Sequence, residues 1–535
     1  MVRRLVPASA VLAVALIAVS PAFAAPRFTG ATRIAATGDT TVGAIANLPD
    51  GGELVGGSFT GTATFGSTVL TSAGRTDGFV ARRASDGTYA WARAYGGAEV
   101  DAVTAIAVAS DGSPLVVGQF GPSWLVATFI AKLTPGGTDV WSRDVWSPVT
   151  ASGLNTAYGH AVVALDDGGL MVIGNGARDE AGCQCFAFGS RPTPALQVSR
   201  DDGGDIWVTR LDSSGAFLWA KGYGGAANDQ GLAIVRLPNA GIAIGGEFRN
   251  TAAFGTIPLT SSAGATPNGF VARIAASDGS VAEATQIASD GGSSVTALDA
   301  SADGRLLVAG TISGTTTFPG ADTLNRGQDS AFAALQVPGG DFAWSSASEP
   351  AGGDGANLAA AALRSDGTAL IAGTIEGYLG AATRFGASSL TSSSSDEAAF
   401  VAGISTDGRF SWAASGGTSP TGVTGLTALS ARADGTAQIG IDFDPAVGDA
   451  TFGTVAIAGS ASYDTAGLVD VLDVPVAPAA PTARAGAGQA SVEVVGLGAA
   501  VTRYVVVASP GGRSCVITPP AVSCTVDGLT NGTAY

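Results

Sequence analysis

The stretch Asp77-Gly78-Phe79-Val80-Ala81-Arg82, with the turn Asp86-Gly87 and the run Tyr89-Ala90-Trp91-Ala92 after it, is one copy of the pattern that decides the fold. An Asp-Gly pair between two alternating apolar runs is a strong β-hairpin signal, because both turn residues adopt positive φ at low cost. Upstream, the turn Asp50-Gly51 separates two further apolar runs, the second of which ends in Gly56-Gly57. The four runs predict four antiparallel strands that pair in chain order.

The same order of strands and turns is written seven times, with a period of about sixty residues. The turns before the second strand of each unit are Asp50-Gly51, Asp111-Gly112, Asp167-Gly168, Ala240-Gly241, Asp303-Gly304, Asp366-Gly367 and Asp434-Gly435. One four-stranded sheet cannot bury both of its faces alone, whereas a ring of such sheets can. The repeat therefore predicts an all-β fold, a seven-bladed β-propeller over residues 27–474.

Tryptophan holds one position in most units, four residues after the glycine of the last turn. The pairs are Gly87/Trp91, Gly137/Trp141, Gly215/Trp219, Gly340/Trp344 and Gly408/Trp412. A large aromatic side chain that recurs at one point of each blade predicts packing between neighbouring blades rather than a ligand site. The fourth unit has Glu283 at this position and must pack differently.

The seventh unit stops after Leu468-Val469-Asp470-Val471 and lacks a fourth strand. The run Ala31-Thr32-Arg33-Ile34-Ala35-Ala36, which precedes the first unit, matches the missing strand in composition and position. We expect this N-terminal strand to complete the last blade and close the ring, which removes an open sheet edge.

This repeat, with its Asp-Gly turns, its Asp-Gly-Phe-Val-Ala-Arg strand and its tryptophan, resembles the bacterial seven-bladed β-propeller repeat family called SBBP. The likeness spans about residues 29–474. It implies a secreted propeller, and it supplies no catalytic motif to carry over.

A second domain is expected after a proline-rich linker at residues 475–481. Residues 482–535 resemble the first strands of a bacterial fibronectin type III domain, and their last run, Leu529-Thr530-Asn531-Gly532-Thr533-Ala534-Tyr535, matches the tyrosine corner of such sandwiches. The chain ends where the last strands of that domain would begin, so we expect an incomplete β-sandwich. A fragment and a truncated gene both account for this.

The N-terminus has the form of a secretory signal peptide over residues 1–24. Met1-Val2-Arg3-Arg4 is basic, an apolar run follows, and Ala22-Phe23-Ala24 is a cleavage motif. We expect secretion to the cell surface or the medium, no membrane insertion, and a monomer. The net charge of −17 and the presence of two lysines, Lys132 and Lys221, argue against nucleic acid as a partner.

Few residues offer chemistry. His160 is the single histidine, which excludes clusters of histidines around a metal, and a structural role is favoured over that of a catalytic base. The acidic turns lack the pattern of a calcium-binding EF-hand, although calcium binding stays open. We therefore expect no catalytic residue, no cofactor and no metal ligand.

The four cysteines form two close pairs. Cys515 and Cys524 predict a hairpin-closing disulfide in an oxidising compartment. Cys183 and Cys185 are separated by one residue, so a bridge between them would be strained, and their pairing stays open.

Units two and three depart from the template. Five units carry a Phe-Gly or Phe-Pro element between the second and third strands, at Phe65, Phe254, Phe318, Phe385 and Phe452. Unit three is instead interpreted as a loop over residues 175–205, which holds Cys183, Cys185, Arg191, Arg200, Asp201 and Asp202. Binding sites are often built from loops on a rigid frame, so this insertion is a candidate binding loop, with neutral drift as the alternative.

A basic side chain recurs three residues after the leading aromatic of the third strand, at Arg82, Lys132, Arg210 and Arg273. These residues are a second, weaker candidate for ligand contact.

Two functions remain open. The first is a non-catalytic secreted scaffold that presents propeller loops to a carbohydrate, a protein or another cell-surface partner. The second is an extracellular propeller enzyme, such as a polysaccharide lyase or a quinone-dependent dehydrogenase. One histidine and few lysines favour the first.

Overall fold

The computed structural model describes residues 27–122, 125–147, 156–176, 185–189, 194–199, 206–262, 264–351, 355–376, 382–391, 397–417, 424–432, 435–443, 449–459, 465–472, 482–493, 504–508, 513–517, 523–530 and 533. The chain divides into two compact bodies, residues 27–471 and the residues after them. The expected signal peptide lies outside the described residues. Among those that are described, the regular elements are β-strands and one 3-10 turn, Pro238–Ala240.

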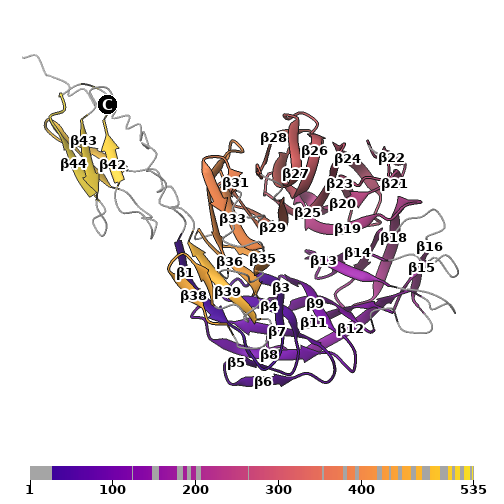
Figure 1. The fold of residues 1–535 in the computed structure, drawn as a ribbon. Coiled ribbons are helices and arrows are strands. Elements are labelled where there is room, and N and C mark those ends of the chain that lie inside the picture. Colours follow the sequence, from indigo (N-terminus) through magenta and orange to yellow (C-terminus); the bar gives the residue numbers. More distant parts are fainter. Residues whose placement is uncertain are drawn as a thin grey trace, which may run out of the picture. The chain divides into compact units, whose positions relative to one another are not determined.

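The first body is a β-propeller, in which strands of each repeat pair antiparallel in chain order (Figure 1). Unit one has β3 (Thr40–Asn47), β4 (Glu53–Phe59), β7 (Asp77–Arg83) and β8 (Tyr89–Tyr95). Unit two has β9 (Ala102–Val108), β10 (Pro114–Phe120), β11 (Ala127–Leu133) and β12 (Asp139–Trp146). Unit three has β13 (Tyr158–Ala164), β14 (Leu170–Asn175), β17 (Ile206–Leu211) and β18 (Phe217–Gly225), and unit four has β19 (Gln230–Arg236), β20 (Gly241–Phe248), β23 (Asn268–Ala275) and β24 (Val281–Ser289).

The remaining units follow the same order. Unit five has β25 (Gly292–Ala300), β26 (Leu306–Thr317), β27 (Leu324–Gln336) and β28 (Phe342–Ala347), and unit six has β29 (Gly355–Leu363), β30 (Ala369–Glu376), β33 (Ala398–Ile404) and β34 (Phe410–Gly416). Unit seven has β35 (Thr424–Ala431), β36 (Thr436–Phe443) and β39 (Thr465–Leu472). The second and third strands carry nearly continuous buried runs, as expected of strands that are covered on both faces.

The N-terminal strand β1 (Arg27–Arg33) is the fourth strand of the last sheet, beside β39. The amide of Ile34 donates to the carbonyl of Ala466 at 3.1 Å, and Phe28 packs against Phe452 with ring centroids 5.2 Å apart. We expected this strand to begin at Ala31, whereas it begins four residues earlier, at Arg27. Ala35–Ala36 form a separate strand, β2, which pairs with β5 (Thr62–Phe65) of unit one instead.

The tryptophans join neighbouring units, as predicted. The indole N–H groups of Trp91, Trp141 and Trp219 donate to the carbonyls of Pro135, Ser213 and Ala276, at 3.0, 3.1 and 3.0 Å. Each acceptor lies in the last turn of the following unit. The turn glycine rests on the same ring, so a Cβ at Gly215 would lie 2.5 Å from Trp141. The packing interpretation is confirmed at these three positions.

This contact makes a testable prediction about Gly215, whose φ of +79° already disfavours any side chain. Gly215→Ala is expected to destabilise the propeller by about 2–4 kcal/mol, because strain at positive φ adds to the clash with Trp141. Gly327→Ala is the control, since a Cβ there would meet nothing within 4 Å. Urea unfolding of both variants gives the difference, and equal midpoints would contradict the prediction.

The second body contains two small sheets. One consists of β40 (Thr482–Ala485), β41 (Gln489–Glu493) and β44 (Ser523–Asp527), and the other of β42 (Tyr504–Val507) and β43 (Ser514–Ile517). The disulfide between Cys515 and Cys524 is confirmed. It joins β43 to β44, which belong to different sheets, so it links the sheets rather than closing a hydrogen-bonded hairpin. The expected corner residue Tyr535 lies outside the described residues.

Candidate functional site

The candidate binding loop of unit three is only partly described. Cys183, Arg191, Arg200, Asp201 and Asp202 lie outside the described residues, as does the side chain of Cys185. Their role as a binding loop, and the pairing of the two cysteines, therefore stay predictions.

The described part of that segment is not a loop. It contains β15 (Cys185–Phe188) and β16 (Leu196–Ser199), which form a hairpin. The expectation of an irregular loop is wrong for these residues. Phe188-Gly189 is the Phe-Gly element of unit three, and the insertion on either side of it moved it out of the expected spacing. Phe188 packs on Trp207 and Phe217 with ring centroids 5.8 and 5.7 Å away.

Hairpins of this kind occur in six of the described units, and most of them contact the outer strand of the preceding unit. In units one, three and four the hairpins are β5 with β6 (Thr68–Thr71), β15 with β16, and β21 (Thr251–Phe254) with β22 (Ile257–Thr260). In unit five the hairpin is formed by the C-terminal end of β26 and the N-terminal end of β27. In units six and seven the hairpins are β31 (Ala382–Phe385) with β32 (Ser388–Thr391), and β37 (Ala450–Phe452) with β38 (Val455–Ile457). The hairpins of units three, four and five pair with β12, β18 and β24. Those of units six and seven meet the preceding unit through single bridges, and that of unit one pairs with β2.

The hairpin phenylalanine is the centre of an aromatic stack. Phe254, for example, lies between Phe270 of its own unit and Tyr223 of the preceding unit, with ring centroids 4.4 and 6.1 Å away. The six hairpin phenylalanines, Phe65, Phe188, Phe254, Phe318, Phe385 and Phe452, are all buried. The hairpins are therefore part of the core as well as links between sheets.

The described residues of unit two form no such hairpin. Its second strand ends at Phe120 and its third begins at Ala127, and Ser123 and Trp124 in the short connection lie outside the described residues. Tyr95 of unit one, which matches Tyr223 in the repeat, stacks directly on Phe129, with centroids 5.4 Å apart and an interplanar angle of 17°. At the junction of units three and four Phe254 separates the two corresponding rings, and no described phenylalanine does so here.

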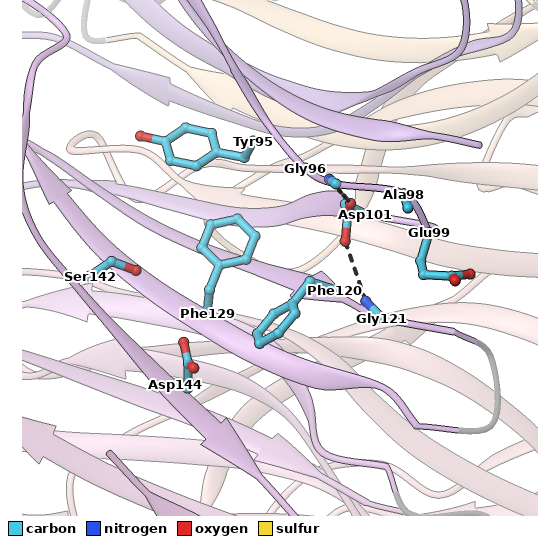
Figure 2. Close-up of a pocket in the computed structure, with 11 residues that line it drawn as sticks. Tyr95, Gly96, Ala98, Glu99, Asp101, Phe120, Gly121, Phe129, Ser142 and Asp144 are labelled. Carbon is cyan, nitrogen blue, oxygen red and sulfur yellow. Dashed lines mark hydrogen bonds between the residues drawn. The ribbon is translucent and has the colours of Figure 1, made fainter. Parts of the chain in front are cut away.

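A pocket of about 430 Å³ lies at this point, between units one and two (Figure 2). Its aromatic wall is formed by Tyr95, Phe120 and Phe129. Ser142 and Asp144 line it from β12, and Asp144 is the register partner of Phe129. A volume of this size is typical of pockets that hold a small molecule or one large side chain.

The rim of the pocket is acidic. Glu99, Asp101 and Asp144 all line it. The carboxylate of Asp101 accepts hydrogen bonds from the amides of Gly97 at 2.7 Å and Gly121 at 3.3 Å. Burial raises the pKa of Asp101; these two amide bonds act against the rise, and the charges of Asp77 and Glu99 add to it. The pocket thus joins apolar rings to negative charge, which favours an aromatic group with a basic neighbour.

Tyr95 is held firmly in this wall. Its hydroxyl donates to Asp139 at 3.1 Å, and the guanidinium of Arg93 lies over its ring, 5.7 Å from the centroid. Burial, followed by the charge of Asp139, raises the pKa of the Tyr95 phenol, so the ring is neutral throughout the physiological range.

The recurrent basic side chains have structural partners. Arg82 and Arg210 form ion pairs with Asp50 and Asp167, the turn aspartates of their own units, and Lys132 lies 3.4 Å from Asp111. Arg82 and Arg210 also donate to carbonyls in the next unit, at 3.2 and 3.0 Å. Like the tryptophans, they hold neighbouring units together.

His160 lies on the innermost strand of unit three and is hydrogen-bonded to Asn175. Burial lowers its pKa below 6.5, and the bond to Asn175 acts against this shift. As the pH falls through 6.5, His160 is therefore protonated in the unfolded chain while it stays neutral in the folded chain. The stability that His160 contributes is present above this pH and is lost below it.

A titration tests this. Between about pH 7.5 and about pH 5.5, the wild-type protein is expected to lose up to about 1 kcal/mol more stability than His160→Gln, which retains an amide for Asn175. Urea unfolding at both pH values measures the difference. Because this is the only histidine of the chain, parallel pH profiles for the two proteins would contradict the assignment.

The described ranges contain no group of three or more His, Cys, Asp or Glu residues arranged to hold a metal ion. No helix in the part of the chain that the structure describes is long and apolar enough to cross a membrane.

No protein-family profile and no curated protein sequence matches this chain. Solved structures with a similar arrangement include quinohemoprotein alcohol dehydrogenase from Comamonas testosteroni, at 11% identity and a TM-score of 0.40 over 85% of this chain and 78% of that chain. Acylaminoacyl peptidase from Pyrococcus horikoshii has 10% identity and a TM-score of 0.36 over 85% and 58%. YCF48 from Cyanidioschyzon merolae has 9% identity and a TM-score of 0.34 over 83% and 99%. At such low identities and TM-scores, the activities of these proteins say nothing about the activity of this chain.

Proposed function

We propose that this protein is a secreted, non-catalytic binding protein, built on a rigid seven-bladed propeller closed by β1 and followed by an incomplete fibronectin-like sandwich. The ring is supported by the contacts of the first strands: β3 contacts β9, each further first strand contacts the next, and β35 contacts β3 again. The seven repeats of the sequence and their likeness to SBBP repeats agree with this arrangement.

The observation that carries the proposal is the pocket between units one and two. Elsewhere in the described ring the corresponding space is occupied by a hairpin and its buried phenylalanine. A repeat that omits one element leaves an open pocket between packed sheets, so we expect ligand binding there to require little reordering.

Secretion is supported by two features. The disulfide between Cys515 and Cys524 indicates an oxidising environment, and residues 1–24 have the composition of a signal peptide. The partner is accordingly a carbohydrate or a protein of the cell surface or medium.

The proposal is tested by screening the secreted protein on glycan and peptide arrays, alongside a panel of hydrolase, lyase and dehydrogenase substrates. Ser142→Trp places a large side chain in the pocket, and Leu218→Trp is the control, because Leu218 is exposed and lies in a different unit. We expect binding that Ser142→Trp abolishes and Leu218→Trp retains. Substrate turnover without binding would overturn the proposal.

A further inference from the structure

We propose that the pocket between units one and two, together with the open end of β8, binds an extended peptide of another protein by strand addition, with an aromatic side chain in the pocket. This inference rests on the proposed binding function and names its ligand class.

The closest parallel is the junction of units three and four. There Tyr223-Gly224-Gly225 ends the outer strand of unit three, and β21 of unit four pairs with its last two residues, Gly224 with Ala253 and Gly225 with Ala252. Phe254, the next residue of that hairpin, enters the stack beside Tyr223. Strand pairing and aromatic packing thus come from one short segment.

Unit one repeats the acceptor half of this junction. Tyr95-Gly96-Gly97 follows the same order, and the side chain of Asp101 accepts from Gly97 as Asp229 accepts from Gly225. No described strand is hydrogen-bonded to the outer side of β8. The strand end that accepts a hairpin in unit three is thus present in unit one, but no described hairpin pairs with it.

Gly97 gives an independent indication. At Gly225 any side chain would strike the carbonyl of Thr251 in the docked hairpin, so close approach of a second backbone requires glycine there. At Gly97 a Cβ would meet nothing within 4 Å. The Cβ side of Gly97 is therefore open to a second strand, while Gly74 lies against the carbonyl of Gly97, and no described strand fills the open side.

The chemistry of the ligand follows from the lining. Tyr95, Phe120 and Phe129 present ring surfaces to an aromatic side chain. The carboxylate of Glu99 on the rim favours a lysine or arginine beside it. Main-chain hydrogen bonds to an open strand end supply affinity, and the pocket supplies selectivity.

The occupant is a foreign peptide rather than a second copy of this chain. Each described Phe-Gly or Phe-Pro hairpin is already docked in its own ring, and its phenylalanine is at most 1% exposed. A second copy would have to break its own core to supply one.

A fluorescent peptide with the sequence of residues 249–260 is the probe, because it contains the Phe254 hairpin and a basic residue, Arg249. We expect anisotropy to give a dissociation constant on the order of 100 µM. Replacing the phenylalanine of the peptide by alanine should weaken binding at least about tenfold. Ser142→Trp and Gly97→Phe in the protein should do the same, while Leu218→Trp should not.

Several outcomes overturn the inference. They are no saturable binding below about 1 mM, equal affinity of the alanine peptide, or equal affinity of Ser142→Trp protein that retains the wild-type melting temperature. Sedimentation velocity of the protein alone tests whether a second copy of the chain occupies the pocket. A dimer that Ser142→Trp disrupts would show that the occupant is a second copy and not a foreign peptide. If the peptide fails but a glycan binds in a manner that Ser142→Trp abolishes, the proposed function stands and this inference alone is lost.

Discussion

Removal of β1 by deletion of residues 27–33 is expected to destabilise the propeller by about 3–5 kcal/mol and to cause aggregation. The deletion leaves the last sheet with β35, β36 and β39, so the outer side of β39 becomes an unpaired edge. It also removes Phe28 from the ring of Phe452 and detaches Ile34, which is 1% exposed.

Thermal unfolding and light scattering of the deleted protein measure both effects. The control ends the chain at residue 480, which removes more residues but no described strand of the propeller. That variant should keep the melting transition of the propeller. If the deletion of β1 leaves the transition unchanged, β1 does not stabilise the ring.

Phe254→Ala should be the most damaging single substitution in a hairpin, at about 3–5 kcal/mol. Phe254 is fully buried between Phe270 and Tyr223, and truncation leaves a cavity that the surrounding strands cannot close. The hairpin would also lose the side chain that fixes it against unit three.

The control for Phe254→Ala is Val69→Ala, in the hairpin of unit one, because Val69 is 60% exposed. That change should cost less than about 0.5 kcal/mol. Urea unfolding compares the two. Similar losses would mean that the aromatic stacks add little to the stability of the ring.

The sequence predicts the strand order and the links between units well, because both follow from local signals. Asp-Gly turns define the hairpins, and the constant distance from turn glycine to tryptophan reflects one packing site, which the hydrogen bond from Trp141 to Ser213 confirms. The pairing of Cys515 with Cys524 was also predicted and is confirmed.

Two errors have different causes, which are competition between distant partners and an insertion that disturbs the repeat. Ala35–Ala36 resembles the end of a fourth strand, yet it pairs with β5, and only the folded chain decides between these partners. Phe188-Gly189 was overlooked because the surrounding insertion hides its spacing, although the dipeptide itself was a usable signal.

The pocket was not predicted, because it arises from an omitted hairpin and not from an inserted segment. Two signals were available in the sequence. Unit two passes from Phe120 to Ala127 without a Phe-Gly pair, and unit one retains Tyr95-Gly96-Gly97 as unit three retains Tyr223-Gly224-Gly225. These two differences from the repeat mark the position of the pocket.

The pairing of β1 with β39 also bears on how the chain folds. Thr29 donates to the carbonyl of Asp470 across 441 residues of sequence, whereas most strands of the ring pair with their immediate neighbours in the chain. Long loops close slowly and at an entropic cost, so we expect the local sheets to form first and the ring to close last. During synthesis β1 waits without its partner, because β39 is the last strand of the propeller to be made, and we expect this unpaired strand to be the part of the nascent chain that a chaperone has most to protect.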